Sequence, residues 1–251
     1  MIHPESIVGA AALLGAWAGA WWARREAPPA GRVAAFAAAL VAGVAATNGP
    51  LHDLAERPVF AAHMAQHLVL ILGMAPLLLA ATPGWMVDGL LGVILGGPRW
   101  RALARALTRP VPALGLYAGA LIAWHLPGPF ERAVESHAWH LVAHMVLVAG
   151  AILAWWPVLS SSRLLPPLPY GAQILYLFAF GIPMTVVAAM IAGAEEVLYP
   201  RGAAGLDDQR LGGIIMWVPA GLVPLAAFTI VFFRWAAEEA DEGMEEGDFS
   251  K

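Results

Sequence analysis

The sequence predicts an all-α membrane protein, a polytopic helix bundle with about seven transmembrane helices. Of its 251 residues, 60% are hydrophobic and 13% are charged, whereas soluble domains are about 45–50% apolar and about 25% charged. The mean hydropathy is +0.68. Because so few charges could not cover so much apolar surface in water, we expect the chain to lie in a lipid bilayer. Its net charge of −4 gives no indication of a nucleic-acid partner.

Seven apolar runs are predicted to cross a hydrocarbon layer that is about 30 Å thick. They cover residues 6–23, 33–47, 58–81, 111–126, 137–159, 170–194 and 211–235. A further apolar run, residues 85–95, is too short to cross and is expected to lie at the membrane interface. We therefore predict one transmembrane domain over residues 1–237. The acidic segment that follows, residues 238–251, is expected to be a disordered cytoplasmic tail.

The basic residues predict how the bundle is oriented, because cytoplasmic loops are enriched in Lys and Arg. With the N-terminus outside, ten of the 14 Lys and Arg residues fall on the inner side: Arg24, Arg25, Arg32, Arg99, Arg101, Arg105, Arg109, Arg163, Arg234 and Lys251. The others fall on the outer side: Arg57, Arg132, Arg201 and Arg210. The N-terminus is therefore predicted to be outside, and all eight histidines then fall at the outer end.

Five of these histidines are concentrated at the starts of two predicted spans. His63 and His67 are four residues apart at the start of the third span, and His137, His140 and His144 open the fifth. Both spacings place imidazoles on one face of a helix. An imidazole in hydrocarbon is costly without a polar partner, so such residues indicate a functional site.

Metal binding is the chemistry that best accounts for this pattern. His63 and His67 facing His140 and His144 would complete a four-coordinate site, and His137 could add a ligand. Secondary residues that could orient or cover the site are His52, His125, Met64, Met145, Asp208 and Gln209. The methionines are more often packing residues, and the glycines after Gln209 can equally serve close helix packing. Since the chain has no cysteine, imidazole and thioether groups favour copper over zinc.

Other functions remain open at this point. Two facing imidazoles could hold a haem, which would make the chain a membrane redox protein. A copper transporter would need further ligands deeper in the bundle, for which the candidates are Met74, Met184, Met190 and Met216. The histidine runs are also similar to those of membrane di-iron oxygenases, but there is no paired His-His motif. The sequence has no arrangement typical of nucleophilic catalysis, so the chain is not expected to be an enzyme.

An ordered set of motifs resembles the CtaG family of polytopic bacterial cytochrome c oxidase assembly factors. The set consists of His63-Met64-Ala65-Gln66-His67, Met74-Ala75-Pro76-Leu77-Leu78, Trp124-His125-Leu126-Pro127, His140-Leu141-Val142-Ala143-His144, Trp155-Trp156-Pro157, Asp208-Gln209, Gly212-Gly213 and Met216-Trp217. It extends over roughly residues 45–235. The absence of cysteine fits this polytopic family rather than the single-span copper-delivery factor that shares its name.

The resemblance implies a multi-pass protein of the bacterial plasma (inner) membrane that helps haem-copper oxidases to mature. It implies copper as the metal handled, while haem stays the less favoured candidate that the facing imidazoles leave open. The implied partners are cytochrome c oxidase subunits and a periplasmic copper chaperone, besides the lipid bilayer. Which residues would hold copper is predicted only by the spacing of the histidines and the topology.

Overall fold

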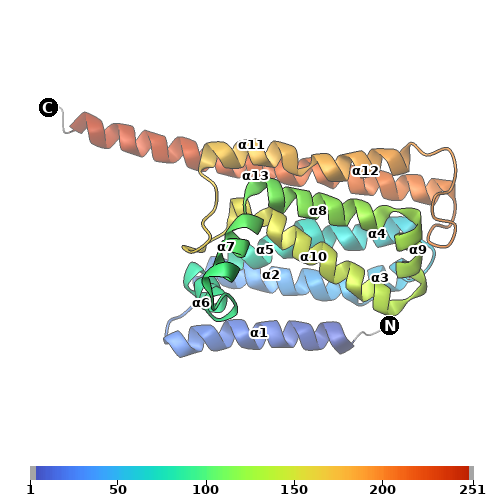
Figure 1. Cartoon of the computed structure of the whole chain (residues 1–251), viewed down its shortest axis with the longest axis horizontal. Coiled ribbons are helices and arrows are strands. Elements are labelled where there is room, and N and C mark those ends of the chain that lie inside the picture. The colour runs from blue at the N-terminus through green and yellow to red at the C-terminus, as the bar shows by residue number, and fades with distance from the viewer. Residues whose placement is uncertain (1–3, 249–251) are drawn as a thin grey trace.

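The computed structural model describes residues 4–248, and all regular secondary structure in this range is helical. Figure 1 shows long helices that lie roughly side by side. The elements are α1 (Pro4–Arg24), α2 (Ala30–Thr47), α3 (Pro50–Ala55), α4 (Phe60–Leu68), the π-helix η1 (Val69–Met74), α5 (Ala75–Ala81), α6 (Gly84–Ile94), α7 (Pro98–Leu107), α8 (Pro110–His125), α9 (Pro127–Glu135), α10 (His137–Leu159), α11 (Tyr170–Phe180), α12 (Ile182–Ala192) and α13 (Leu206–Asp248).

Six helical segments in the described chain are long and apolar enough to cross a membrane, which confirms the predicted class of a polytopic helix bundle. They are Ser6–Arg24, Ala30–Ala55, Phe60–Ala81, His137–Leu159, Tyr170–Ala192 and Leu206–Asp241. A seventh is counted if α7 and α8, which meet at an angle of 73°, form one broken span. The short helix α6 does not qualify as a span, in agreement with its predicted length.

The bundle has two distinct ends. Helices α3 and α9 and the starts of α1, α4 and α10 lie at one end, which we call the histidine end (Figure 1). Helices α6 and α7 lie at the opposite end, where α13 runs out beyond the other helices. The start of α1 and the end of α13 are thus at opposite ends, as an odd number of crossings requires. That the histidine end faces the outside remains a prediction from the positions of the basic residues.

One hydrophobic core holds most of the bundle together, while α1 is attached separately. The main core is formed by buried side chains of α4, η1, α5, α8, α10, α11, α12 and α13. Helix α1 packs through Trp17 and Trp21, which contact Phe36 and Trp85, and the Trp17 indole donates to the Ala81 carbonyl at 3.3 Å. Toward the histidine end, α1 and α10 border an apolar groove of about 340 Å³.

The third span is not a regular α-helix, because α4 and α5 are separated by the π-helix η1. Pro76 lies just after it and has no backbone N–H, and its ring would clash with the carbonyl four residues earlier in an α-helix. A wider turn relieves that clash. The Trp155 indole donates a hydrogen bond of 3.1 Å to the Ile71 carbonyl within the π-helix. Such irregular turns are often found next to functional sites.

The acidic C-terminal segment continues the last helix of the bundle. Instead of ending near residue 237, α13 continues as a helix to Asp248. Glutamate and alanine, which predominate after Trp235, are good helix formers, and an existing helix is extended more easily than a new one is nucleated. The described helix thus includes residues 238–248, residues 249–251 lie outside the described range, and a disordered cytoplasmic tail stays a prediction.

At the opposite end, Asp88 of α6 fixes the loop between α10 and α11. Its carboxylate accepts a hydrogen bond of 2.5 Å from the Ser162 hydroxyl and one of 3.1 Å from the Arg163 amide. Burial alone would raise the pKa of the Asp88 carboxyl, but these hydrogen bonds lower it below its usual range. The contact should therefore persist above about pH 4 and be lost as the pH falls below that value.

We expect Asp88→Asn, which imitates the protonated acid, to loosen this loop at neutral pH. The measurement is the rate of tryptic cleavage after Arg163 in detergent-solubilised protein. Cleavage should be several-fold faster in Asp88→Asn than in the unsubstituted protein. An equal rate would show that the carboxylate does not hold the loop.

Candidate functional site

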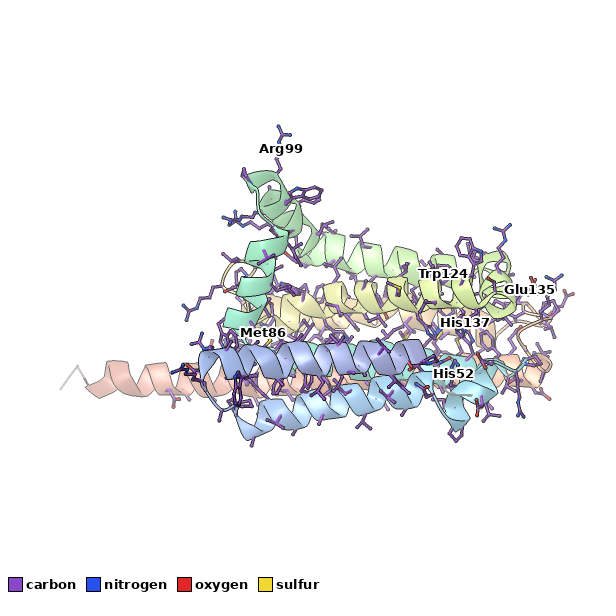
Figure 2. All side chains as sticks on the ribbon, turned by 90° about the horizontal axis from the view of Figure 1, so that it is seen from below. His52, Met86, Arg99, Trp124, Glu135 and His137 are labelled. Carbon is purple, nitrogen blue, oxygen red and sulfur yellow. The ribbon has the colours of Figure 1, made fainter. Side chains whose placement is uncertain are left out.

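The described histidines gather at the histidine end from four different helices. His52 comes from α3, His63 and His67 from α4, and His125 from the end of α8. The remaining three, His137, His140 and His144, lie along α10. Figure 2 labels His52 and His137 at this end together with Trp124 and Glu135, while Met86 and Arg99 lie at the other end. The fold thus brings together histidines that are up to 92 residues apart (144 − 52 = 92).

Three of these side chains form a compact set, which we call the histidine triad: His63, His67 and His140. One ring nitrogen of each lies within 4.8 Å of those of the other two, and all three side chains are buried. Imidazole nitrogens that bind one ion at about 2.0–2.1 Å are some 3–4 Å apart. Small side-chain rotations would therefore convert the triad into a three-coordinate site. The spacing argument predicted all three of these residues.

His144, the fourth predicted ligand, lies beside the triad but is not part of it. Its ring centre is 4.3 Å from that of His140 and 5.0 Å from that of His67. Its Nε2 atom is buried and has no hydrogen-bond partner. His144 also lines the apolar groove beside α1, together with Met74 and Met145. It is thus positioned between the triad and the lipid-facing groove.

His67 is the most unusual side chain of the set. It is 6% exposed, and neither of its ring nitrogens has a hydrogen-bond partner in the described structure. Leaving a buried polar group unsatisfied costs about 1–3 kcal/mol. A histidine with only a packing role would therefore make the fold less stable than an apolar residue of similar size. Two unpaired nitrogens facing other imidazoles fit a residue that binds a metal ion.

His125 is held in one tautomer by the end of its own helix. Its Nδ1 lies 2.7 Å from the Leu121 carbonyl, which can only accept, so Nδ1 must carry the proton. The Nε2 atom therefore presents a lone pair, and it is buried with no hydrogen-bond partner. The His125 ring centre is 6.3 Å from that of His67. His125, predicted only as a secondary residue, thus has one unpaired ring nitrogen and lies outside the triad.

His52 is oriented differently, by a hydrogen-bond chain that begins at Gln66. The Gln66 amide nitrogen donates to the Ala46 carbonyl at 2.8 Å and contacts the Nδ1 atom of His52 at 2.9 Å. Because this nitrogen is a donor, Nδ1 of His52 accepts, and its Nε2 atom carries the proton. Nε2 lies 3.3 Å from the Glu56 carboxylate. His52 therefore orients the site and, at 6.4 Å between ring centres, stacks near His140.

The remaining predicted residues have distinct surroundings. His137 is exposed, and it lines a cavity with His63 and His140. Met64 is 1% exposed and belongs to the main core. Met145 is 64% exposed. The structure thus places neither methionine among the imidazoles of the triad.

Asp208 and Gln209 hold backbone groups instead of imidazoles. The Asp208 carboxylate accepts from the amides of Phe60 and Ala61, at 2.7 and 3.1 Å, and so satisfies the first turn of α4. It also accepts from the Ala204 amide at 3.0 Å. The Gln209 side chain accepts from the Leu198 amide at 2.6 Å. Asp208 therefore fixes the start of the helix that carries His63 and His67.

Asp208→Asn should destabilise the protein, because an amide group cannot accept all three hydrogen bonds. Leaving a partly buried amide unpaired costs about 1–3 kcal/mol, which corresponds to a fall in Tm of roughly 3–10 °C. The measurement is tryptophan fluorescence during thermal unfolding in detergent. Asp207→Asn is the matched control, since the neighbouring side chain is exposed, and its Tm should stay within about 1 °C. Equal melting of the two variants would contradict the capping role.

Some residues of the site were not given a role by the sequence reasoning. Gln66 is fully buried in the described structure, and its polar side chain within an apolar helix was an available signal. Glu56 is four residues after His52, a spacing that brings two side chains together on a helix. The rings of Phe60, Phe130 and Tyr199 pack together beside the triad, and the ring centres of His63 and Phe130 are 5.0 Å apart. No spacing rule predicts that packing.

Comparison with known proteins identifies the family. The model of the cytochrome c oxidase caa3 assembly factor family (Caa3_CtaG) matches residues 13–238, which include most of the first span, the spans between it and α13, and every residue of the site described above. No curated protein and no solved structure matched the chain. The family match agrees with the resemblance of the ordered motifs. The chain therefore belongs to the family of cytochrome c oxidase caa3 assembly factors.

Proposed function

We propose that the chain holds a copper ion on the histidine triad and transfers it to a cytochrome c oxidase subunit during assembly. The observation that carries the proposal is the set of three buried imidazoles whose nitrogens lie within 4.8 Å of one another. Membership of an oxidase assembly family supplies the recipient. Copper is favoured over zinc because structural zinc sites commonly use cysteine, and this chain has none. Copper is the cargo here, so the site must both load and release it.

Transfer at one end of the bundle is better supported than transport across it. A transport path would need ligands at successive depths, and methionines were the candidates. Met184 and Met216 are each 2% exposed within the main core, whereas the side chain of Met190 is 69% exposed. Met74 faces the apolar groove instead. These thioethers do not share one face or one cavity, so they do not support a continuous path.

The spacing of the triad also argues against haem. Two axial imidazoles bind iron from opposite faces of the porphyrin ring. A third imidazole nitrogen within 4.8 Å of both would occupy the space of the ring itself. A haem would therefore require the triad to separate, whereas a single ion would require only small rotations.

The histidine end is proposed to face the periplasm, with the chain in the bacterial inner membrane. This orientation follows from the positive-inside distribution of Arg and Lys. Copper would then be received from the periplasmic side, where a soluble copper chaperone is the proposed donor. The handover needs no passage of copper through the cytoplasm.

The experiment that tests the proposal is metal analysis of the detergent-purified protein after incubation with copper and desalting. We expect about one copper per chain by mass spectrometry and no Soret band in the visible spectrum of the same sample. A Soret band would favour a haem protein. Absence of bound copper after incubation with either Cu(I) or Cu(II) would refute the proposal.

A further inference from the structure

A polar cavity of about 260 Å³ lies beside the triad at the histidine end. Its polar lining consists of Glu56, His63, His137 and His140, and the rest is formed by small or apolar side chains. Two of these four residues, His63 and His140, belong to the triad. The cavity therefore places a carboxylate and a further imidazole in the same space as two proposed copper ligands.

The other two polar residues lie nearer to the aqueous surface. His137 is exposed, and the Glu56 side chain is 28% exposed. His63 and His140 are only 3% and 9% exposed. Exposure thus decreases from Glu56 and His137 to the triad residues of the same cavity. An ion arriving from water would meet the outer pair before the buried pair.

The Glu56 carboxylate lies at ion-pair distance from the ring of His52. Its Oε1 atom lies 3.3 Å from Nε2 of His52, whose ring is held in turn by Gln66. Gln66 precedes His67 of the triad in the same helix. The carboxylate therefore lies next to a ring that is oriented from the helix that carries two of the triad histidines. It brings a negative charge to the cavity, where the imidazoles alone would offer a cation none.

We propose that Glu56 and His137 form an outer reception site for copper, from which the ion passes to His63 and His140. This inference rests on the proposed function of the triad. A negative charge at the mouth of a cavity raises the local concentration of a cation and its rate of association. One carboxylate and one imidazole bind Cu(II) more weakly than three imidazoles do, so the ion would move inward without a change of oxidation state. Only the ligands are exchanged.

The test separates the rate of loading from the final amount bound. Copper(II) sulfate is mixed with metal-free protein in a stopped-flow instrument, and quenching of tryptophan fluorescence gives the rate. Desalting and mass spectrometry give the copper bound at equilibrium. Glu56→Gln should load about tenfold more slowly, within the range of electrostatic steering, yet still bind about one copper per chain.

The matched control is Glu195→Gln, which removes the same charge from an exposed position in the loop between α12 and α13. Its loading rate should stay within about twofold of the unsubstituted protein. Glu56→Asp, which keeps the charge, should recover part of the lost rate. If Glu56→Gln fails to fold, His137→Gln at the exposed position replaces it, with the same slow loading expected.

Each outcome has a separate meaning. Loading of the Glu56→Gln or His137→Gln variant at the unsubstituted rate would overturn the reception site and leave the triad proposal intact. Complete loss of copper at equilibrium in Glu56→Gln would place Glu56 in the final site and would also overturn a transient role. An unsubstituted protein that takes up no copper would refute the proposed function itself.

Discussion

Replacing His67 with leucine should abolish copper binding and leave the metal-free protein at least as stable as the original. The substitution removes two buried nitrogens that have no hydrogen-bond partner, and with them a desolvation cost of about 1–3 kcal/mol. The Tm of the metal-free protein should therefore rise by roughly 2–8 °C. Added copper should raise the Tm of the unsubstituted protein, because a ligand that binds only the folded state stabilises it. It should not raise that of His67→Leu.

The control for this prediction lies on the same helix. Met64→Leu changes a buried core residue with little change of volume, and such substitutions usually cost less than about 1.5 kcal/mol. Its copper stoichiometry should be unchanged. Retention of one copper per chain in His67→Leu would remove His67 from the ligand set. A marked loss of stability in that variant would instead indicate that the imidazole is needed for packing.

Gly213→Ala should destabilise the protein strongly, because α13 lies against the backbone of α12 at this position. A Cβ atom at Gly213 would lie 2.7 Å from the Ala192 nitrogen and 3.0 Å from the Ala188 carbonyl oxygen of α12. These are backbone atoms, so the clash is relieved only if the two helices move apart. Overpacking of this kind costs about 1–3 kcal/mol or more, and we expect the Tm to fall by at least roughly 5 °C.

Gly221→Ala is the matched control in the same helix, because a Cβ atom there meets no other heavy atom within 4 Å. Alanine is the better helix former, so this variant should be neutral or slightly more stable. The two variants can be compared by thermal unfolding under identical detergent conditions. Similar melting of Gly213→Ala and Gly221→Ala would mean that α12 and α13 are not in such close contact.

The Gly212-Gly213 pair was predicted to permit close helix packing, and the short distances to Ala188 and Ala192 agree with that prediction.

The sequence was most informative where chemistry and helical periodicity coincide. Hydropathy predicted the spans, because a segment that crosses hydrocarbon must be apolar. Such a segment must also be helical in order to satisfy its own backbone groups. The i, i+4 spacing of His63 and His67 predicted that both imidazoles share a face. The contact of His140 with His63 and His67 could be predicted as well. It depends only on the third and fifth spans, which carry histidines at the same end, being neighbours. Family membership of the chain was likewise predicted from motifs that could be read in order.

Contacts between distant parts of the chain could not be predicted in this way. Asp208 reaches the Phe60 amide across 148 residues, and its partner is a backbone group that leaves no trace in the sequence. The difference between His125, which presents Nε2, and His52, whose Nε2 faces Glu56, depends on which acceptor or donor lies nearby. Local spacing says nothing about those neighbours.

The π-helix η1 also determines which way the histidines of the third span point. A π-turn contains about one residue more than an α-turn, and one residue corresponds to about 100° of rotation around a helix axis. Helix α5 is seated against α2 and α10, so its orientation is set independently of the histidines. Without the additional residue, the face that carries His63 and His67 would be turned by that angle relative to α5. The number of residues in η1, which lies deeper in the membrane than the histidines, therefore determines that the imidazoles point toward α10.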